Sequence, residues 1–204
     1  MNADASADWQ ASLITPSFRG DLELAQALCD SIDRHVDPAI DHVLVVPRRD
    51  VPLFANLSNH RRRVQPEEDL LPRSFVRLPL PKKIQLGPWF HKRLRTLWLT
   101  PYGLVRGWML QQILKLSATE ISPRDIFVFA DSDTVFVRPF SMADLVVDGQ
   151  VRLYSNPGVC EGSPTHRQWH AEAARWLGLP PCDYFGADHI GTGIAGTRQT
   201  LLEL

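Results

Sequence analysis

Two aspartates separated by one serine, Asp131 and Asp133, are the residues of this chain with the clearest capacity for chemistry. They follow the segment 125–130 (Asp-Ile-Phe-Val-Phe-Ala), whose apolar run is typical of a central strand covered on both faces. Residues i and i+2 of an extended chain point to the same side, so we expect the two carboxylates to converge. Like charges at close range are costly unless a cation or a proton compensates them.

The aspartate pair therefore predicts a divalent metal site, with Mg²⁺ or Mn²⁺ as the ion. Hard cations prefer oxygen ligands and leave coordination positions open for phosphate oxygens. Ligands of open α/β sheets bind beyond the carboxyl ends of the strands, which is where the pair lies. The alternative is a pair of acidic residues in a solvent-exposed turn, which the apolar Val135-Phe136-Val137 directly after the pair disfavours.

The elements around the pair predict an α/β fold with a mostly parallel, doubly wound sheet and helices on both faces. Strands are expected at 11–14, 42–46, 74–78 and 125–130, and helices at 20–36, 51–57 and 105–119. The last of these helices is expected to bury a seam that includes Trp108, Met109 and Leu116. Residues 79–103 are interpreted as an irregular loop, and Arg61-Arg62-Arg63 as a surface turn or an anion site.

Four short motifs follow one another in a characteristic order. They are Thr15-Pro16-Ser17 after the first strand, Gln111-Gln112 and Lys115-Leu116 on a helix, Phe-Ala-Asp-Ser-Asp-Thr at 129–134, and Arg138-Pro139-Phe140. This order resembles that of GT-A glycosyltransferases, and most closely a poorly characterised bacterial glycosyltransferase-like group. The resemblance covers residues 11–145 well and the remainder weakly.

The resemblance implies a metal-dependent glycosyltransferase that takes a sugar from a nucleotide-sugar, expected to be UDP-linked, to an unknown glycan or small-molecule acceptor. It implies that Asp133 is a direct ligand of Mn²⁺ or Mg²⁺ and that Asp131 contacts the ribose or the metal. Thr15, Pro16 and Ser17 are implied to line the pocket of the nucleotide base.

Lys115 lies on the helix before the metal strand, and the resemblance implies that it faces the donor. A cation there could neutralise the leaving diphosphate, which is electrostatic stabilisation of developing charge. Gln111 lies four residues earlier and can share the same face of the helix.

The C-terminal third offers weaker candidates. Many GT-A enzymes use a late histidine as a further metal ligand, and His189 is the candidate for that role. Asp183 or Asp188 is the candidate for a base or an acceptor contact, and Asp188 is our choice for the base that an inverting enzyme needs. His166 and His170 lie one turn apart on a helix expected at 165–177, and they are interpreted as surface histidines.

We expect a disordered N-terminus at 1–10, a nucleotide-sugar-binding half at 11–145, and an acceptor-side part of the same domain at 146–204. The chain stops within what resembles the first turns of an amphipathic helix, so we expect a truncated C-terminal part.

The composition excludes some classes of partner. The net charge of −1 gives no bulk attraction to nucleic acid or to an anionic membrane. The sequence has no apolar run of about 18 residues, so no transmembrane segment is predicted. Three widely spaced cysteines without a CxxC pair favour a reducing compartment, and together with the acidic N-terminus they predict the cytoplasm.

Two other functions fit parts of the sequence. A phosphatase of the haloacid-dehalogenase type would use segment 131–135 as its first motif and Asp183 with Asp188 as a later acidic pair. That motif normally opens its fold, whereas a long α/β region precedes it here. A GT-A domain that binds a nucleotide or a glycan without transferring a sugar is the third hypothesis.

Overall fold

The computed structural model describes residues 9–79, 83–86, 90–93, 97–158, 163–180, 187–189, 191 and 193–203, with side chains omitted for 83–86 and 90–93. Asp183, Cys160, Cys182 and all but the last two residues of the expected disordered terminus lie outside these ranges. Gln10 belongs to the ordered structure, because its backbone N–H donates to the Asp125 carboxylate at 3.0 Å.

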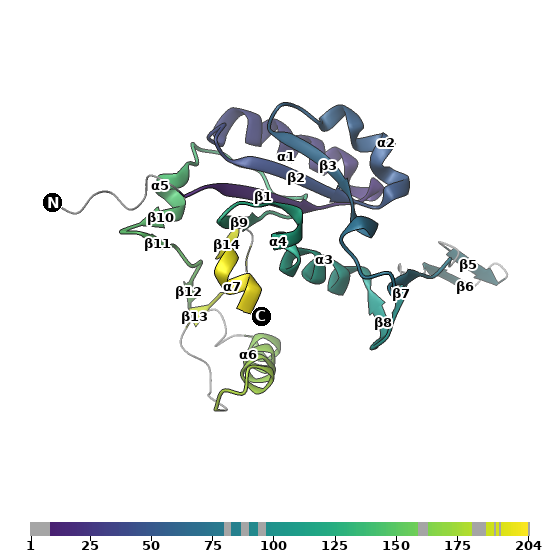
Figure 1. Ribbon diagram of the computed structural model, residues 1–204. Helices are drawn as coiled ribbons and strands as arrows, with labels where there is room; N and C mark the ends of the chain where they lie inside the picture. The colour runs from purple at the N-terminus through teal and green to yellow at the C-terminus, as the bar shows by residue number, and fades with distance from the viewer. Residues whose placement is uncertain are drawn as a thin grey trace.

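A five-stranded sheet forms the centre of the protein (Figure 1). In spatial order its strands are β3 (Arg62–Pro66), β2 (Asp41–Val46), β1 (Ala11–Pro16), β9 (Ile126–Phe129) and β14 (Ile194–Thr197). The first four run parallel, and β14 pairs with β9 in the antiparallel sense. The prediction of an α/β fold with a mostly parallel sheet is confirmed.

Helices cover both faces of this sheet. The helices and 3-10 turns of one face are η1 (Arg19–Asp21), α1 (Leu22–His35), η2 (Arg48–Asp50), α2 (Val51–Phe54) and η3 (Ala55–Leu57), and the other face has α3 (Gly107–Leu116), α4 (Ala118–Ile121) and α7 (Arg198–Glu203). Leu13 of β1 packs with Leu28 of α1, whereas the next residue, Ile14, packs with Leu114 of α3. Adjacent residues of a strand face opposite sides, so the sheet buries both its faces.

The chain changes direction across the sheet between β1 and β9. It steps outward from β1 to β2 and β3, and then crosses to the other side of β1 to form β9. The connections from β1 to β3 lie on one face, and α3 and α4 precede β9 on the opposite face. In open α/β sheets the crevice at such a switch point, at the carboxyl ends of the strands, is where ligands bind.

The third parallel strand is not where the sequence pattern indicated. We predicted it at 74–78, but it is β3, which contains the arginine-rich segment. The remaining elements between η4 (Glu67–Asp69) and α3 are β4 (Val76–Arg77), β5 (Lys83–Leu86), β6 (Phe90–Arg93), β7 (Leu97–Thr100) and β8 (Gly103–Arg106). They form small antiparallel sheets, so the interpretation of 79–103 as an irregular loop is wrong.

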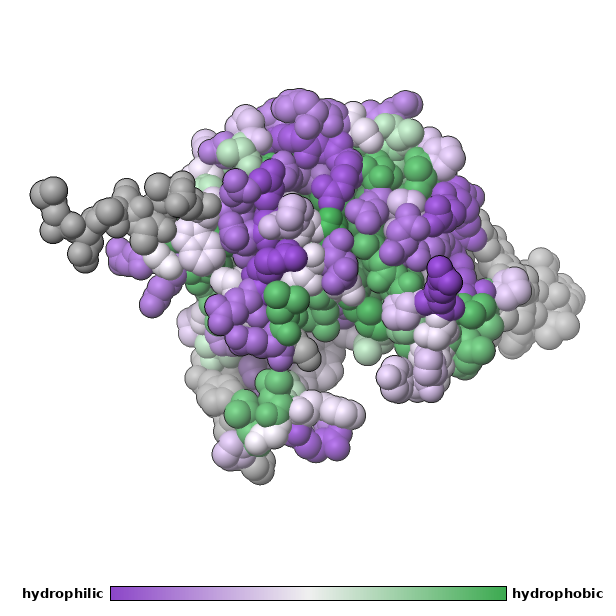
Figure 2. Space-filling view, in the orientation of Figure 1, coloured by the Kyte–Doolittle hydropathy of each residue, from purple (hydrophilic) through white to green (hydrophobic). Residues whose placement is uncertain are grey.

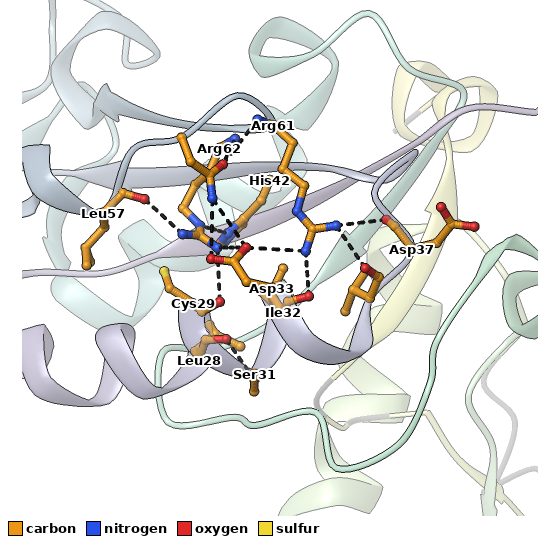
Figure 3. A network of polar contacts seen from close by, with 12 residues as sticks. Leu28, Cys29, Ser31, Ile32, Asp33, Asp37, His42, Leu57, Arg61 and Arg62 are labelled. Atoms are coloured by element: carbon orange, nitrogen blue, oxygen red, sulfur yellow. Dashed lines mark hydrogen bonds and ion pairs between the residues drawn. The ribbon is translucent and has the colours of Figure 1, made fainter.

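Buried hydrogen bonds explain why arginines occur in a parallel strand (Figure 3). The guanidinium of Arg61 donates to the carbonyl oxygens of Ile32 and Val36, at the end of α1. The guanidinium of Arg62 donates to the carbonyl of Cys29 at 3.0 Å and to the Asp33 carboxylate at 2.6 Å. The last carbonyls of a helix lack intrahelical partners and attract cations, so these side chains cap α1. Neither the surface turn nor the anion site that we considered describes this segment.

His42 belongs to the same network. Nε of Arg62 donates to Nδ1 of His42 at 2.8 Å, and an arginine Nε–H can only donate. The proton of the ring is therefore on Nε2, which donates to Oγ1 of Thr15 at 3.1 Å. Complete burial and the neighbouring Arg62 and Arg61 cations lower the pKa of His42 to about 3. A neutral histidine thus joins β1, β2 and β3 in the interior.

Helix α3 buries a different side from the one we predicted. Trp108, Met109 and Leu116 are 58%, 47% and 52% exposed, whereas Leu110 and Leu114 are buried against the sheet. These two leucines are one turn apart and lie on the side of the helix opposite to Trp108. The expected seam is therefore wrong for Trp108, Met109 and Leu116, whereas its other apolar members Val105 and Ile113 do pack against the core.

The C-terminal part of the chain returns to the central sheet. Its elements are α5 (Met142–Leu145), β10 (Val146–Val147), β11 (Gln150–Val151), β12 (Asn156–Pro157), α6 (Pro164–Trp176), β13 (Ala187–Asp188), β14 and α7. Pairing of β14 with β9 makes this part an edge of the same sheet. Over the described ranges, no helix has the length and apolar character needed to cross a bilayer.

Candidate functional site

Polar residues gather at the carboxyl ends of β1 and β9, the two strands that flank the switch point. Ser17 follows β1, and Asp131 and Asp133 follow β9. The N–H of Gly193 donates to the carbonyl of Phe129 at 2.8 Å, which places the start of β14 beside the same strand end. We call Ser17, Asp131 and Asp133 the switch-point edge.

The chain turns sharply directly after β9. The N–H of Thr134 donates to the carbonyl of Asp131 at 3.0 Å, which closes a four-residue turn. Our argument that an extended chain brings Asp131 and Asp133 to one side is therefore wrong, because the backbone between them is not extended. Both carboxylates nevertheless remain accessible, since the Asp131 side chain is 39% exposed and Asp133 is exposed.

Lys115 contacts the switch-point edge from α3. Its Nζ lies 2.8 Å from Oδ1 of Asp131, although the two residues are 16 positions apart. The lysine side chain is only 14% exposed. The structure thus brings together the two residues that we expected to face the donor. It also gives one carboxylate of the pair a cationic partner.

Hydrogen bonds to α1 hold the turn in place. Ser132 is buried, and its hydroxyl donates to the Asp21 carboxylate at 3.1 Å, just before α1. Farther along, the N–H of Phe136 donates to Oγ of Ser31 at 3.0 Å. The segment is anchored on both sides of Asp133, so that carboxylate projects from a defined position.

Two buried hydroxyls near this edge have no hydrogen-bond partner among the described residues: Oγ of Ser17 and Oγ1 of Thr134. An unpaired buried polar group costs about 1–3 kcal/mol, which a ligand or water can offset. Ser17 is therefore the residue of the first motif best placed to contact a ligand. Thr15 is not, because its fully buried hydroxyl pairs with His42 beneath α1. Pro16 is buried as well.

Gln111 lies one turn before Lys115 on α3 and is half-buried. Trp108, Gln111 and Lys115 follow one another at helical spacing on α3. The helix therefore presents an amide and an aromatic ring beside the lysine that contacts Asp131.

His189 and Asp188 each have a hydrogen-bond partner in the C-terminal part of the chain. Nδ1 of His189 donates to the carbonyl of Tyr154 at 2.7 Å. Asp188 is buried on β13 and accepts from His166. No three metal-ligating side chains come together in the described parts of the chain. The role of His189 as a metal ligand stays a prediction, because only its Nδ1 is engaged by Tyr154.

A family model matches residues 12–193, which is most of the chain and includes every residue of the site. Its description is a family of unknown function, DUF6492. The chain belongs to DUF6492. No protein with a curated description matches it. The function of this DUF6492 member therefore has to be argued from its own side chains.

Our sequence analysis missed one set of contacts in this DUF6492 chain, which centres on His166. Nδ1 of His166 lies 2.8 Å from Oδ2 of Asp188, and the ring of His166 stacks on Trp169 with centroids 5.1 Å apart. Trp169 in turn stacks on Trp108 of α3 at 6.1 Å. We interpreted His166 as a surface histidine because nothing in the pattern of α6 shows a partner 22 residues later.

Proposed function

We propose that this protein is a metal-dependent glycosyltransferase that moves a sugar from a nucleotide-sugar, expected to be UDP-linked, to a glycan or small-molecule acceptor. The observation that supports this most is the contact of Lys115 with Asp131 at the switch point between β1 and β9, with the exposed Asp133 beside it. A cation and two carboxylates at this place suit a diphosphate and its counter-ion.

A divalent ion is compatible with the side chains present. Oδ1 of Asp131 is engaged by Lys115, whereas Asp133 is exposed on an anchored turn. Mg²⁺ and Mn²⁺ are bound through one or two carboxylates together with substrate phosphates, so a preassembled cage is not required. Asp133 and Asp131 would hold the ion, which would supply positive charge to the diphosphate as its bond to the sugar breaks.

The remaining residues position the donor. Lys115 balances the Asp131 charge before the donor binds, and its ammonium can turn to a phosphate oxygen when the diphosphate arrives. In a partly buried site such a contact is stronger than in water. The unpaired hydroxyl of Ser17 is placed to bond the nucleoside part of the donor. Gln111 can donate to a sugar hydroxyl from the turn before Lys115.

Calorimetric titration of UDP in the presence and absence of Mn²⁺ tests the proposal. We expect Mn²⁺ to strengthen UDP binding and Asp133→Asn to abolish that gain without unfolding the protein. Asp148→Asn is the matched control, because Asp148 is an exposed aspartate at φ 51°, a conformation that asparagine tolerates. Equal UDP affinity with and without Mn²⁺ in the wild-type protein would refute the assignment.

Turnover separates the remaining hypotheses. A transferase releases UDP from a UDP-sugar when water or an acceptor takes the sugar. Binding of UDP without formation of UDP from any UDP-sugar would indicate a nucleotide-binding domain that does not transfer a sugar. Modification of Asp131 by beryllofluoride, together with phosphate-ester hydrolysis, would instead indicate the phosphatase.

A further inference from the structure

We propose that His166 is the general base that takes the proton of the acceptor hydroxyl, that Asp188 positions its ring, and that Trp169 and Trp108 form a shelf for the acceptor. This inference rests on the proposed transferase function and adds a second half to its site. It also replaces Asp188 as the base: Asp188 touches His166 and not the substrate.

The first step is the state of the imidazole. The Asp188 side chain is 3% exposed, and a buried carboxylate is costly unless it is paired. Its Oδ2 lies 2.8 Å from Nδ1 of His166. A carboxylate accepts hydrogen bonds, so Nδ1 bears a proton, and in the neutral ring Nε2 keeps its lone pair. Histidine bases are held in this tautomer by a carboxylate behind the ring, which also stabilises the imidazolium that forms.

The second step is access. The His166 side chain is 25% exposed, and Nε2 has no hydrogen-bond partner among the described residues. The ring is fixed in orientation by Trp169, which lies one turn farther along α6 and stacks on it at an interplanar angle of 17°. Asp188 of β13 is the charged group that faces the ring, and Trp169 presents an aromatic face to it. A pair that served only to tie α6 to β13 would not need an exposed ring.

The third step connects this base to the donor side. Trp169 stacks on Trp108 at an interplanar angle of 27°, and these rings remain 42% and 58% exposed. Trp108 and Lys115 are seven residues apart on α3, which is two turns or about 10 Å along one side of the helix. Trp108 thus joins α3, the helix that also carries Lys115, to Trp169 and the imidazole of His166 on α6.

The exposed indole rings have the character that an acceptor sugar requires. Figure 2 shows a hollow between the lower lobe, which contains α6, and the lobe of β7 and β8. In Figure 1, α3 lies above the space between these two lobes. Exposed indole rings offer flat apolar faces with a polar N–H at the edge, which match the C–H face and the hydroxyls of a pyranose.

The reaction balances with these groups alone. Nε2 of His166 takes the proton of the acceptor hydroxyl as the oxygen forms a bond to the anomeric carbon. The bond from that carbon to the diphosphate oxygen breaks, and its electron pair leaves with the diphosphate. The imidazolium then loses its proton to solvent. The acceptor oxygen attacks from the side opposite the diphosphate in this single displacement, so the proposed enzyme inverts the anomeric configuration.

The experiment compares His166→Gln, Asp188→Asn and a control, His60→Gln, whose residue is exposed before β3. The probes are UDP for binding with Mn²⁺ and a panel of UDP-sugars for UDP release. We expect His166→Gln to bind UDP with an affinity within about twofold of the wild type. It should form UDP from a UDP-sugar about 10²–10⁴-fold more slowly, the range of general-base catalysis. His60→Gln should match the wild type in both measurements.

Asp188→Asn distinguishes positioning from a structural role. Loss of the carboxylate leaves the ring without its orienting partner, so turnover is expected to fall while UDP binding with Mn²⁺ stays near the wild-type value. Loss of a purely structural residue would weaken UDP binding and turnover together.

Nuclear magnetic resonance of the nitrogen-15-labelled imidazoles supplies a measurement that needs no turnover. We expect His166 to show the Nδ1–H tautomer in the wild-type protein and to lose it in Asp188→Asn. Normal formation of UDP from a UDP-sugar by His166→Gln, or an Nε2–H tautomer in the wild type, would overturn this inference. Wild-type protein that binds UDP but forms none from any UDP-sugar would refute the proposed transferase function as well. Failure of the wild type to bind UDP with Mn²⁺ would instead refute the transferase itself.

Discussion

Nζ of Lys115 lies 2.8 Å from Oδ1 of Asp131, so a lysine of α3 and an aspartate of the turn after β9 form one charged unit at the switch point. Because Asp131 is 39% exposed, this pair contributes little to stability, at most about 1 kcal/mol. Its position between the sheet end and α3 matters more for binding a diphosphate. Removing the lysine should therefore weaken diphosphate binding much more than it lowers stability.

Lys115→Met is expected to weaken UDP binding about tenfold or more in the presence of Mn²⁺, because the ammonium that contacts the phosphates is lost. The free energy of unfolding, measured with urea, should change by less than about 1 kcal/mol. Lys115→Arg keeps the charge and should retain most of the affinity. Unchanged UDP affinity in Lys115→Met would remove Lys115 from the donor site.

Ser17→Ala is expected to leave the free energy of unfolding unchanged or slightly higher. Oγ of Ser17 is buried without a partner among the described residues, and replacing an unpaired buried hydroxyl removes its desolvation cost. UDP affinity should fall, by about 1 kcal/mol, if that hydroxyl bonds the nucleotide. Thermal unfolding and calorimetry measure the two effects. A destabilised variant with normal UDP affinity would show that Ser17 serves the interior.

The protein is expected to lose stability on acidification because of His42. Burial, with Arg62 and Arg61 nearby, lowers the pKa of His42 to about 3, from 6.5 for an unperturbed histidine. The unfolded chain therefore binds one more proton than the folded chain between these values, and the free energy of unfolding falls as the pH drops through this window. The contribution is about 1.4 kcal/mol per pH unit.

The variant His42→Gln isolates this effect, because glutamine can accept from Arg62 and donate to Thr15. Comparing the pH dependence of stability of the wild type and His42→Gln also cancels the opposite contribution of Glu67. Burial and the neighbouring Glu68 raise the pKa of Glu67 to about 7, so Glu67 lowers stability as the pH rises from 4.5 to 7. Urea unfolding at several pH values should show a shallower dependence in His42→Gln below pH 6.5. Parallel curves would contradict the neutral state of His42.

Apolar runs were a sound guide to the centre of the sheet. Segments 11–14, 42–46 and 125–130 are so rich in apolar residues that only a strand covered on both faces accommodates them, and all three lie in the central sheet. Their order along the chain also sufficed to predict parallel pairing with helices on both faces. The position of the aspartates directly after β9 follows from the same run.

The sequence pattern failed where polar groups are buried. Arg61 and Arg62 resemble surface residues until α1 supplies the carbonyl oxygens and the carboxylate that make their burial favourable. On α3, Trp108 and Leu114 are both largely apolar, and periodicity did not show us which of the two faces the sheet.

The sequence by itself determined which segments are buried strands and which acids follow them, because burial of apolar side chains depends on local composition and spacing. Only the tertiary structure decided that Lys115 contacts Asp131, that Asp188 lies behind His166, and that Thr15 turns inward to His42. Each of these contacts joins residues distant in the sequence. A hydrogen bond needs a partner within about 3 Å, which only the packed chain provides.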